Sequence, residues 1–414
     1  MPSSNVWQAW DMEFKEIPFT ELLSKIIDNR GRSCPTAETG LPLIATNCIR
    51  NDILYPAFEK VRYVSTSTYE SWFRGHPEPG DLIFVCKGTP GRVCMTPGPV
   101  SFCIAQDMVA VRADPRKVYP KYLFAVLRSS QVQEQISNMH VGTLIPHFKK
   151  GDFDKLLLPI PDNQSQEIIG DTYFELSAKI ELNRRMNATL EAMARTLFHS
   201  WFVDFDPVRA KLDGREPVGL DSAIAALFPH SFQVSEVGHI PQGWRLGRLS
   251  DLCNLKRGHD LPASNRTPGP IPVISSSGIS GSHSETHIRG PGVVTGRYGT
   301  IGKVFYVETD YWPLNTTLYV DDVKGNPPRF IFHVLGEVNF QKYIDKAAVP
   351  GVNRNHLHAE PMVLPPMELR QAFANTVSPL WALHTANEME SCNLANLRDT
   401  LLPKLLSGEL HINE

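Results

Sequence analysis

The 414-residue sequence lacks several features that would assign it to a familiar class of protein. It contains no run of 18 apolar residues, so we expect no membrane-spanning helix. Its first residues lack a basic segment followed by an apolar one, so we expect no secretory signal. The seven cysteines are scattered and include no CxxC pair, which favours reduced thiols over a disulfide framework. Together these absences predict a protein of the cytoplasm.

A charge excess and metal-ligand motifs are also missing. The formal net charge is only −3, with 41 Lys and Arg against 44 Asp and Glu. This balance excludes a generic polycation, so any nucleic-acid binding has to come from local basic patches or be shared with a partner. Cys86, Cys94 and Cys103 fit no zinc-ligand spacing, and the 14 histidines include no HExxH pair. We predict no metal site in this chain.

Proline is absent from most of one long stretch, residues 156–207. After Pro161 the next proline is Pro207. A continuous helix of about forty residues there would be roughly 60 Å long. Helices of globular proteins average about 11–12 residues. Such a rod is suited to holding two parts of a protein apart.

What the sequence does contain is an internal repeat of long period. Residues 79–93, which include the glycine-rich segment 88–93, return at 291–304 with an offset of about 211. The long proline-poor stretch returns near residue 363, with an offset of 204 between Asn183 and Asn387. The shared order of the matches predicts a globular unit, a long helix, a second globular unit and a second long helix.

The globular parts have the pattern of α/β domains. Short apolar or β-branched runs bounded by Gly and Pro predict strands, and helical spacing predicts helices. The predicted strands are 41–45, 81–86, 103–112, 271–275, 292–295, 303–308 and 316–321, and the predicted helices are 120–139, 328–346 and a short one near 222–227. The predicted fold class is α/β, with two globular domains separated by two long antiparallel coiled-coil helices in a pseudo-two-fold internal repeat.

Heptad spacing marks both long helices, which favours a left-handed supercoil with a partner helix. If a two-fold axis relates the repeats, the two helices run antiparallel and can pair with each other. Asn183 and Asn387 occupy seam positions, where a buried polar pair would fix the register at a cost in stability. A solvated edge of the seam is the alternative. The residues predicted for helix register and docking are Asn183, Asn187, Leu190, Leu197, Trp201, Asn387, Leu394 and Leu401.

No catalytic constellation emerges from the sequence. The segment 326–329, Asn-Pro-Pro-Arg, is similar to the Asn-Pro-Pro-aromatic motif of amino-methyltransferases, but the aromatic ring is missing and no glycine-rich turn for S-adenosylmethionine precedes it. The segment 299–304 has the wrong glycine spacing for a P-loop. Asp204 and Asp206 could form a metal pair, but Asp206 precedes a proline and is better explained as the stop of the long helix. We predict no catalytic residues.

Basic and amide side chains near glycines are the candidates for nucleic-acid binding. Glycine lets a backbone approach phosphate closely, Arg and Lys neutralise phosphate or read guanine, and Asn reads adenine. For any single residue, a solvated surface charge or a turn is the alternative. The candidate DNA-binding residues are Arg74, Lys87, Arg92, Lys149, Lys150, Arg257, Arg266, Arg297, Tyr298, Lys303, Arg354 and Asn355.

Several segments resemble the type I restriction–modification specificity subunits. The central conserved region of that family is similar to LPIPDNQSQEI at 158–168, IELNRRMNATLEAMA at 180–194 and SWFVDFDPV at 200–208. Its distal conserved region is similar to LRDTLLPKLLSGEL at 397–410. GTIGKV at 299–304 and WPLNT at 312–316 resemble the core of its target-recognition domains. The first globular part departs from the pattern at Pro90 and at Gln106-Asp107.

The resemblance implies a domain plan and a role. Target-recognition domain 1 would span 1–157, the central helix 158–208, a linker with target-recognition domain 2 209–361, and the distal helix 362–414. Each recognition domain would read one half of a bipartite double-stranded DNA target, and the helices would set the spacing.

The resemblance also implies partners and a cell type. Two methylation subunits would dock on the helices and carry out adenine methylation, and restriction subunits would join the complex for defence against phage. S-adenosylmethionine, ATP and Mg²⁺ would be bound by those partners, with no cofactor and no catalysis in this chain. The protein would act in a bacterial or archaeal cytoplasm, away from membranes. The alternatives are a coiled-coil adaptor that does not bind DNA and a DNA adenine methyltransferase in its own right.

Overall fold

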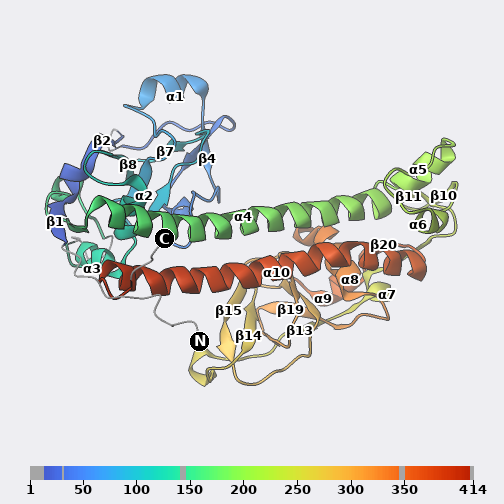
Figure 1. Ribbon diagram of the computed structural model, residues 1–414. Coiled ribbons are helices and arrows are strands. Elements are labelled where there is room, and N and C mark those ends of the chain that lie inside the picture. Colours follow the sequence, from blue (N-terminus) through green and yellow to red (C-terminus); the bar gives the residue numbers. More distant parts are fainter. Residues whose placement is uncertain (1–13, 30–31, 140–145, 345–349, 411–414) are drawn as a thin grey trace, which may run out of the picture. The chain divides into compact units, whose positions relative to one another are not determined.

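The computed structural model describes residues 14–29, 32–139, 146–344 and 350–410 (Figure 1). The chain forms two compact units, each described by itself below. Unit 1 contains residues 1–187 and 385–414, and unit 2 contains residues 188–384. The domain boundaries given above stay a prediction. The expectation that the first residues form no secretory signal concerns positions outside the described residues. Within the described residues, no helix is long and apolar enough to cross a membrane.

Unit 1 is built on three small sheets. A four-stranded antiparallel sheet has the order β2-β8-β5-β6, a three-stranded sheet has the order β4-β3-β7 with β3 and β7 parallel, and β1 pairs with β9. The strands are β1 Lys15–Pro18, β2 Leu23–Ile27, β3 Leu41–Ile44, β4 Arg62–Val64, β5 Leu82–Val85, β6 Val93–Met95, β7 Cys103–Ile104, β8 Met108–Ala113 and β9 Leu157–Ile160.

Strand alternation gives unit 1 two cores, one on each face of the four-stranded sheet. In β5, Leu82 and Phe84 enter one cluster of buried side chains, and Ile83 and Val85 enter another. Successive side chains of a strand point to opposite faces, so a strand covered on both sides reads as a continuous apolar run. The run at 82–85 is fully buried for this reason.

Unit 2 repeats this plan strand by strand. Its sheets have the orders β13-β19-β16-β17, β15-β14-β18 and β12-β20, again with one parallel pair, and a separate hairpin is formed by β10 and β11. The strands are β10 Phe232–Ser235, β11 Gly238–Pro241, β12 Arg245–Arg248, β13 Asn254–Arg257, β14 Ile271–Ser275, β15 Gly278–His283, β16 Gly292–Gly296, β17 Val304–Val307, β18 Trp312–Pro313, β19 Thr317–Asp322 and β20 Pro361–Leu364.

The glycine-rich loops are the same structure in both units. Gly88 and Gly91 have φ values of +87° and +88°, and Gly299 and Gly302 have +73° and +80°. A Cβ at Gly302 would also come within 3.1 Å of a side chain, so only glycine suits this position. The matching sheet orders and loops confirm the predicted internal repeat.

The shorter helices differ from expectation at their ends. The helix predicted over 120–139 is two helices, because the chain turns at Arg128 and Ser129 through bonds to carbonyls three residues back. The helix predicted over 328–346 ends at Glu337, and its positions 345–346 lie outside the described residues. The helices are α1 Thr66–Trp72, α2 Pro120–Leu127, α3 Ser130–Met139, α5 Asp206–Leu212, α6 Ser222–Ala226, α7 Leu249–Leu252, α8 Pro328–Glu337 and α9 Arg354–His358. Short 3₁₀ helices occupy Phe19–Leu22, Thr46–Cys48, Lys150–Asp152, Ala263–Asn265 and Phe340–Tyr343.

The two long helices are α4, Asn163–Phe202, and α10, Met367–Leu406 (Figure 1). Each has 40 residues, which confirms the two predicted rods. Asp162 caps α4, because its carboxylate accepts the Ser165 N–H at 3.0 Å. Asp206 was predicted to stop the rod, but α4 has already ended at Phe202, and Asp206 begins α5.

The long helices pair in opposite directions within each unit. In unit 1, Lys179 of α4 forms an ion pair with Glu390 of α10 at 3.2 Å. In unit 2, Glu191 of α4 meets His384 of α10 at 2.9 Å. A second contact follows in each unit, Asn187 with Asn387 in unit 1 and Phe198 with Phe373 in unit 2. Within each unit residue numbers therefore rise along α4 while they fall along α10, so the helices are antiparallel, as a two-fold repeat predicts.

Candidate nucleic-acid interface

The glycine-rich loop of unit 2, residues 297–303, lies where three segments of that unit meet. The backbone N–H groups of Arg297 and Tyr298 both donate to the Thr316 carbonyl, at 2.9 and 3.1 Å. The Arg297 carbonyl accepts from the Val352 N–H at 3.1 Å. These bonds hold the loop beside the residues that follow Val352.

Five of the predicted DNA-binding residues gather at this meeting point. The Arg297 guanidinium lies 4.4 Å from the centre of the Tyr298 ring, and the Lys303 ammonium lies 5.1 Å from a neighbouring phenylalanine ring. Arg354 and Asn355 are exposed at the start of α9. Three cations, an aromatic ring and an amide beside the glycine-rich loop form a surface that can contact phosphates and base edges.

Two further candidates of unit 2 have different surroundings. Arg257 is exposed at the end of β13, next to the strand that leads from the Thr316 turn. Arg266 is half-buried, and its guanidinium donates to the Ser280 carbonyl at 2.8 Å and to the Leu261 carbonyl at 3.4 Å. The structure therefore gives Arg266 local partners that tie its loop to β15.

The equivalent loop of unit 1 is held by the same backbone bonds. Cys86 and Lys87 donate their N–H groups to the Asp107 carbonyl at 2.9 and 3.2 Å, and the Cys86 carbonyl accepts from Phe148 at 2.8 Å. Because these bonds match those of unit 2, Cys86 stands in the place of Arg297 and Lys87 in the place of Tyr298. The two loops thus share a backbone and differ in the side chains they present.

Two of the remaining candidates of unit 1 pair with one carboxylate. Lys150 forms an ion pair with Asp28, and Arg74 approaches the same carboxylate at 3.7 Å. Lys149 is exposed, and Arg92 is half-buried at the end of the glycine-rich loop. Asp28 directly follows β2, and the equivalent position of unit 2 is occupied by the cation Arg257. The candidate interface of unit 1 is therefore less positive than that of unit 2.

The sequence did not point to an imidazole pair in unit 2. The rings of His259 and His287 lie 3.7 Å apart, and His287 is 4.7 Å from the Trp312 ring. Burial, and then the neighbouring His287, lower the pKa of His259. Asn315, from the segment similar to recognition-domain cores, donates to the Asp260 carboxylate beside this pair. The two histidines are far apart in the chain, so no sequence spacing indicates the pair.

The buried cysteines of the described residues are protonated thiols. Burial raises the pKa of Cys86, Cys103 and Cys253 to about 12, so these thiols stay protonated at neutral pH. Across the described ranges, no cluster of three or more His, Cys, Asp or Glu residues is arranged to hold a metal ion.

The three asparagines among the predicted register residues meet in unit 1. Asn183 donates to the Asn387 carbonyl at 3.4 Å and to the Glu390 carboxylate at 2.7 Å. Asn387 in turn donates its side-chain amide to Asn187 Oδ1 at 2.9 Å. Asn183 is 0% exposed and Asn387 is 5% exposed, so these amides lie inside the seam and not at a solvated edge. Their effect on register stays a prediction.

Charged side chains flank this seam. Glu181 is buried and accepts from Arg184 at 2.8 Å and from Arg185 at 2.7 Å. These bonds lower the pKa of the Glu181 carboxyl against the opposing effect of burial. Trp201 is 1% exposed and lies in the core of unit 2. The other predicted seam residues are half-buried: Leu190, Leu197, Leu394 and Leu401.

Comparisons with known proteins place these features in a family. The family model described as "Type I restriction modification DNA specificity domain" matches residues 38–192 and 241–391. The HindI type I restriction enzyme specificity subunit of Haemophilus influenzae is 25% identical over 378 residues, which cover 75% of this chain and 82% of that protein. The MjaIX specificity subunit of Methanocaldococcus jannaschii is 21% identical, with 98% of each chain covered.

A solved structure has the same fold. The type I restriction–modification S subunit from M. genitalium superposes with a TM-score of 0.55 at 15% identity, covering 95% of this chain and 96% of the other. At this level of identity the likeness concerns the fold.

Proposed function

The chain belongs to the type I restriction–modification DNA specificity family, and from this premise we propose that each unit binds one half of a split double-stranded DNA target. Its role is DNA sequence specificity, and it is a non-catalytic subunit of the system. The relatives are named specificity subunits, which speaks against a non-DNA-binding adaptor and against a methyltransferase acting alone.

One observation carries the proposal of two half-sites. The same loop backbone occurs once in each unit, and it presents different side chains: Cys86 and Lys87 in unit 1, Arg297 and Tyr298 in unit 2. Phosphate contacts position a protein on DNA, whereas side chains on base edges select the sequence. A duplicated frame with different side chains is therefore suited to reading two different short sequences.

We further propose that the long helices set the distance between the half-sites and dock two methylation subunits. Solvent-exposed apolar side chains on the surface of these helices support docking of a partner, because a helix face that stays in contact with water normally carries polar residues. Restriction subunits would join this assembly. S-adenosylmethionine, ATP and Mg²⁺ would be bound by those partners in a bacterial or archaeal cytoplasm. The exposed apolar residues of the helices are Leu182, Met193, Leu383, Met389 and Leu397.

The test is a reconstitution with the cognate methylation subunits. Methylation of genomic DNA by the complex, read by methylome sequencing, should reveal a bipartite motif with a constant gap. A duplex with that motif should bind in a salt-dependent manner, because neutralised phosphates release counterions. Scrambling either half should abolish specific binding. A continuous motif, or binding that does not depend on one of the halves, would refute the two-half-site model.

A second measurement addresses catalysis. This chain alone, incubated with S-adenosylmethionine and the bipartite duplex, should transfer no methyl group, and transfer should appear when the methylation subunits are added. Turnover by the chain alone would contradict its assignment as a non-catalytic subunit.

A further inference from the structure

Unit 2 contains a cavity of about 450 Å³ next to the edge strand β17. Val304 of β17, Phe332, His333 and Gly336 of α8, and Trp381 of α10 contribute to its lining. Among the described residues, β17 is the last strand of its sheet. One side of β17 therefore faces the cavity without a neighbouring strand.

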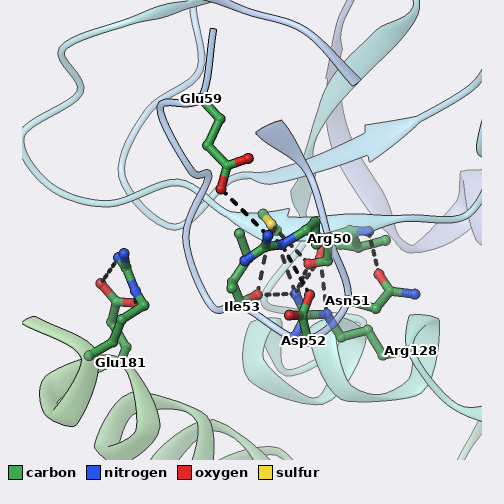
Figure 2. Close-up of polar contacts among 10 residues, drawn as sticks. Arg50, Asn51, Asp52, Ile53, Glu59, Arg128 and Glu181 are labelled. Atoms are coloured by element: carbon green, nitrogen blue, oxygen red, sulfur yellow. Dashed lines mark hydrogen bonds and ion pairs between the residues drawn. The ribbon is translucent and has the colours of Figure 1, made fainter. Parts of the chain in front are cut away.

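Unit 1 fills the corresponding place with its own chain. The guanidinium of the buried Arg128 donates to the Val93 carbonyl at 3.0 Å and to the Arg50 carbonyl at 3.2 Å, and it also contacts the Ile53 carbonyl (Figure 2). It lies 4.3 Å from the centre of the Phe124 ring. Arg128 thus fastens the segment 50–54 between β6 and α2.

The segment 50–54 also covers the edge of β6. The Val93 N–H donates to Asn51 Oδ1 at 2.9 Å, and the Met95 N–H donates to the Leu54 carbonyl at 2.9 Å. In antiparallel sheets every second residue of an edge strand directs its backbone groups outward. Both outward N–H groups of β6 are therefore satisfied by a turn of the same chain, one through the Asn51 side chain and one through the Leu54 carbonyl.

The repeat shows what is missing in unit 2. Val304 and Tyr306 of β17 match Val93 and Met95 in their sheet positions, so their backbone groups point outward as well. No backbone group of the described residues bonds to those groups on the outer side. Arg128 and Gly336 both lie eight residues after the proline that opens their helix. A side chain at Gly336 would meet nothing within 4 Å, so the volume of the arginine is open there.

A buried histidine adds an unmet hydrogen bond to this cavity. His333 is 7% exposed, lines the cavity, and its Nε2 has no partner among the described residues. Its ring stacks on Phe198 at 5.5 Å with an interplanar angle of 18°. A buried polar atom without a partner destabilises the fold, so a group that enters the cavity and bonds to Nε2 would be stabilised.

We propose that the β17 groove, formed by Val304, Tyr306, Phe332, His333 and Gly336, binds an extended segment of a methylation subunit. The segment adds to β17 as a strand: its carbonyls accept from the N–H groups of Val304 and Tyr306, and an apolar side chain covers Phe332. A polar group of the segment bonds to His333 Nε2. This inference rests on the proposed function only in taking a methylation subunit as the partner.

A peptide fits the groove better than a small molecule does. The open backbone groups recur at strand spacing, and the chain's own segment 50–54 satisfies the same pattern in unit 1. Because that place is already filled in unit 1, each chain offers one such groove. The contact therefore involves one methylation subunit per chain even if the long helices dock two.

The first test fills the groove. In Gly336→Arg a guanidinium like that of Arg128 in unit 1 would occupy the cavity, and replacing a helical glycine favours the helix. The full chain should fold as before and bind its cognate methylation subunit at least tenfold more weakly. Ala223→Arg, at an exposed position of α6, is the matched control and should bind like the wild type. Unchanged affinity of Gly336→Arg, with an unchanged unfolding midpoint, would overturn the proposal.

The second test identifies the occupant. Gly336→Cys, in a Cys392→Ser background that removes the exposed native thiol, is labelled with a benzophenone and photolysed in the assembled complex. Crosslinks should fall within one contiguous segment of the methylation subunit. Crosslinks to DNA, to a second copy of this chain or to residues 345–349 of the same chain would overturn the proposal. If the wild-type complex shows no bipartite DNA recognition, the proposed function is refuted instead, so the two failures are distinguishable.

Discussion

At the scale of single residues, the two glycine-rich loops present different chemistry from equivalent backbone positions. Arg297 stacks near Tyr298, which holds the guanidinium in place before any ligand binds. Unit 1 has Cys86 in the position of Arg297, and its thiol stays protonated because burial raises the pKa of Cys86 to about 12. Loss of a loop cation in unit 2 should therefore affect one half-site and leave the other intact.

Arg297→Ala and Lys303→Ala are expected to weaken binding of the reconstituted complex at a single half-site. Each lost phosphate contact should lower the slope of log K against log salt by about 1, and a lost base contact should cost about 1–3 kcal/mol and relax one base position. Competition binding with duplexes altered in one half at a time measures this. Lys324→Ala, an exposed residue paired with Asp322, is the control. Equal losses at both half-sites would refute the modular assignment.

A second residue-scale prediction concerns His333 and pH. Burial lowers the pKa of His333 to about 3, whereas an unfolded histidine titrates near 6.5. Below pH 6.5 the unfolded chain takes up a proton that the folded chain does not, so this residue lowers the free energy of unfolding by up to about 1.4 kcal/mol per pH unit. His333→Phe removes that loss, so the variant should gain stability relative to the wild type between pH 6.5 and 5.5.

Urea unfolding at pH 7.5, 6.5 and 5.5 measures the difference. His239→Phe, at an exposed position of β11, is the matched control and should show the same pH dependence as the wild type. If His333→Phe follows the wild type at all three pH values, the histidine is accessible to protons in the folded chain.

The candidate interface was only partly predictable from single residues. The glycine spacing, Arg297 and Lys303 could be found because the repeat aligns residues 297–303 with residues 86–92 in the sequence. The ion pairs of Asp28 and the neighbouring rings of His259 and His287 could not, because they depend on contacts between distant segments. Arg266 shows the opposite problem, since a charge near glycines in the sequence has local structural partners in the fold.

At the scale of elements, the segment 50–54 depends on a single buried cation. Arg128→Met would keep much of the side-chain volume but remove the donors to the carbonyls of Val93, Arg50 and Ile53. Because buried carbonyls without donors are costly, unit 1 should lose roughly 3 kcal/mol of stability. The Met95 amide, which bonds to Leu54, should lose protection in hydrogen exchange.

Arg116→Met is the matched control for this change. Its side chain is 85% exposed and pairs with Asp114 at the surface, so its removal should leave the stability close to that of the wild type. A Met95 amide that stays protected in Arg128→Met would show that the segment holds its place on β6 without the guanidinium.

The elements were predicted unequally well for physical reasons. Both long helices follow from a sustained heptad pattern, and the fully buried strands follow from short apolar runs. The run 103–112 is instead two strands, β7 and β8, because the Asp107 carbonyl turns away to accept from Cys86 and Lys87. Edge strands such as β17 were predicted as strands. Which strands lie beside them in the sheet could not be predicted, because the strand order depends on contacts between segments that are distant in the sequence.

At the scale of the whole molecule, the paired helices are the element that sets the target gap in the proposed function. Two contacts join α4 to α10 on either side of Thr189: Asn187 with Asn387, and Glu191 with His384. Seven residues complete two turns of a 3.5-residue repeat, so a seven-residue insertion in each helix keeps the seam on the same faces. An insertion after Thr189 matched by one after Thr385 therefore lengthens the pair without changing either unit.

Such a double insertion should lengthen the helix pair by about 10 Å, which corresponds to about three base pairs of DNA. Methylome sequencing should then show both half-sites unchanged and a gap longer by that amount, because only the ruler between the units has changed. Seven residues added to the exposed loop at 213–219 should leave the gap as it was, and an insertion in α4 alone should disrupt the seam and reduce methylation. If the double insertion methylates the original motif with its original gap, the helices do not set the spacing, and the distance between half-sites has to be fixed by the partner subunits.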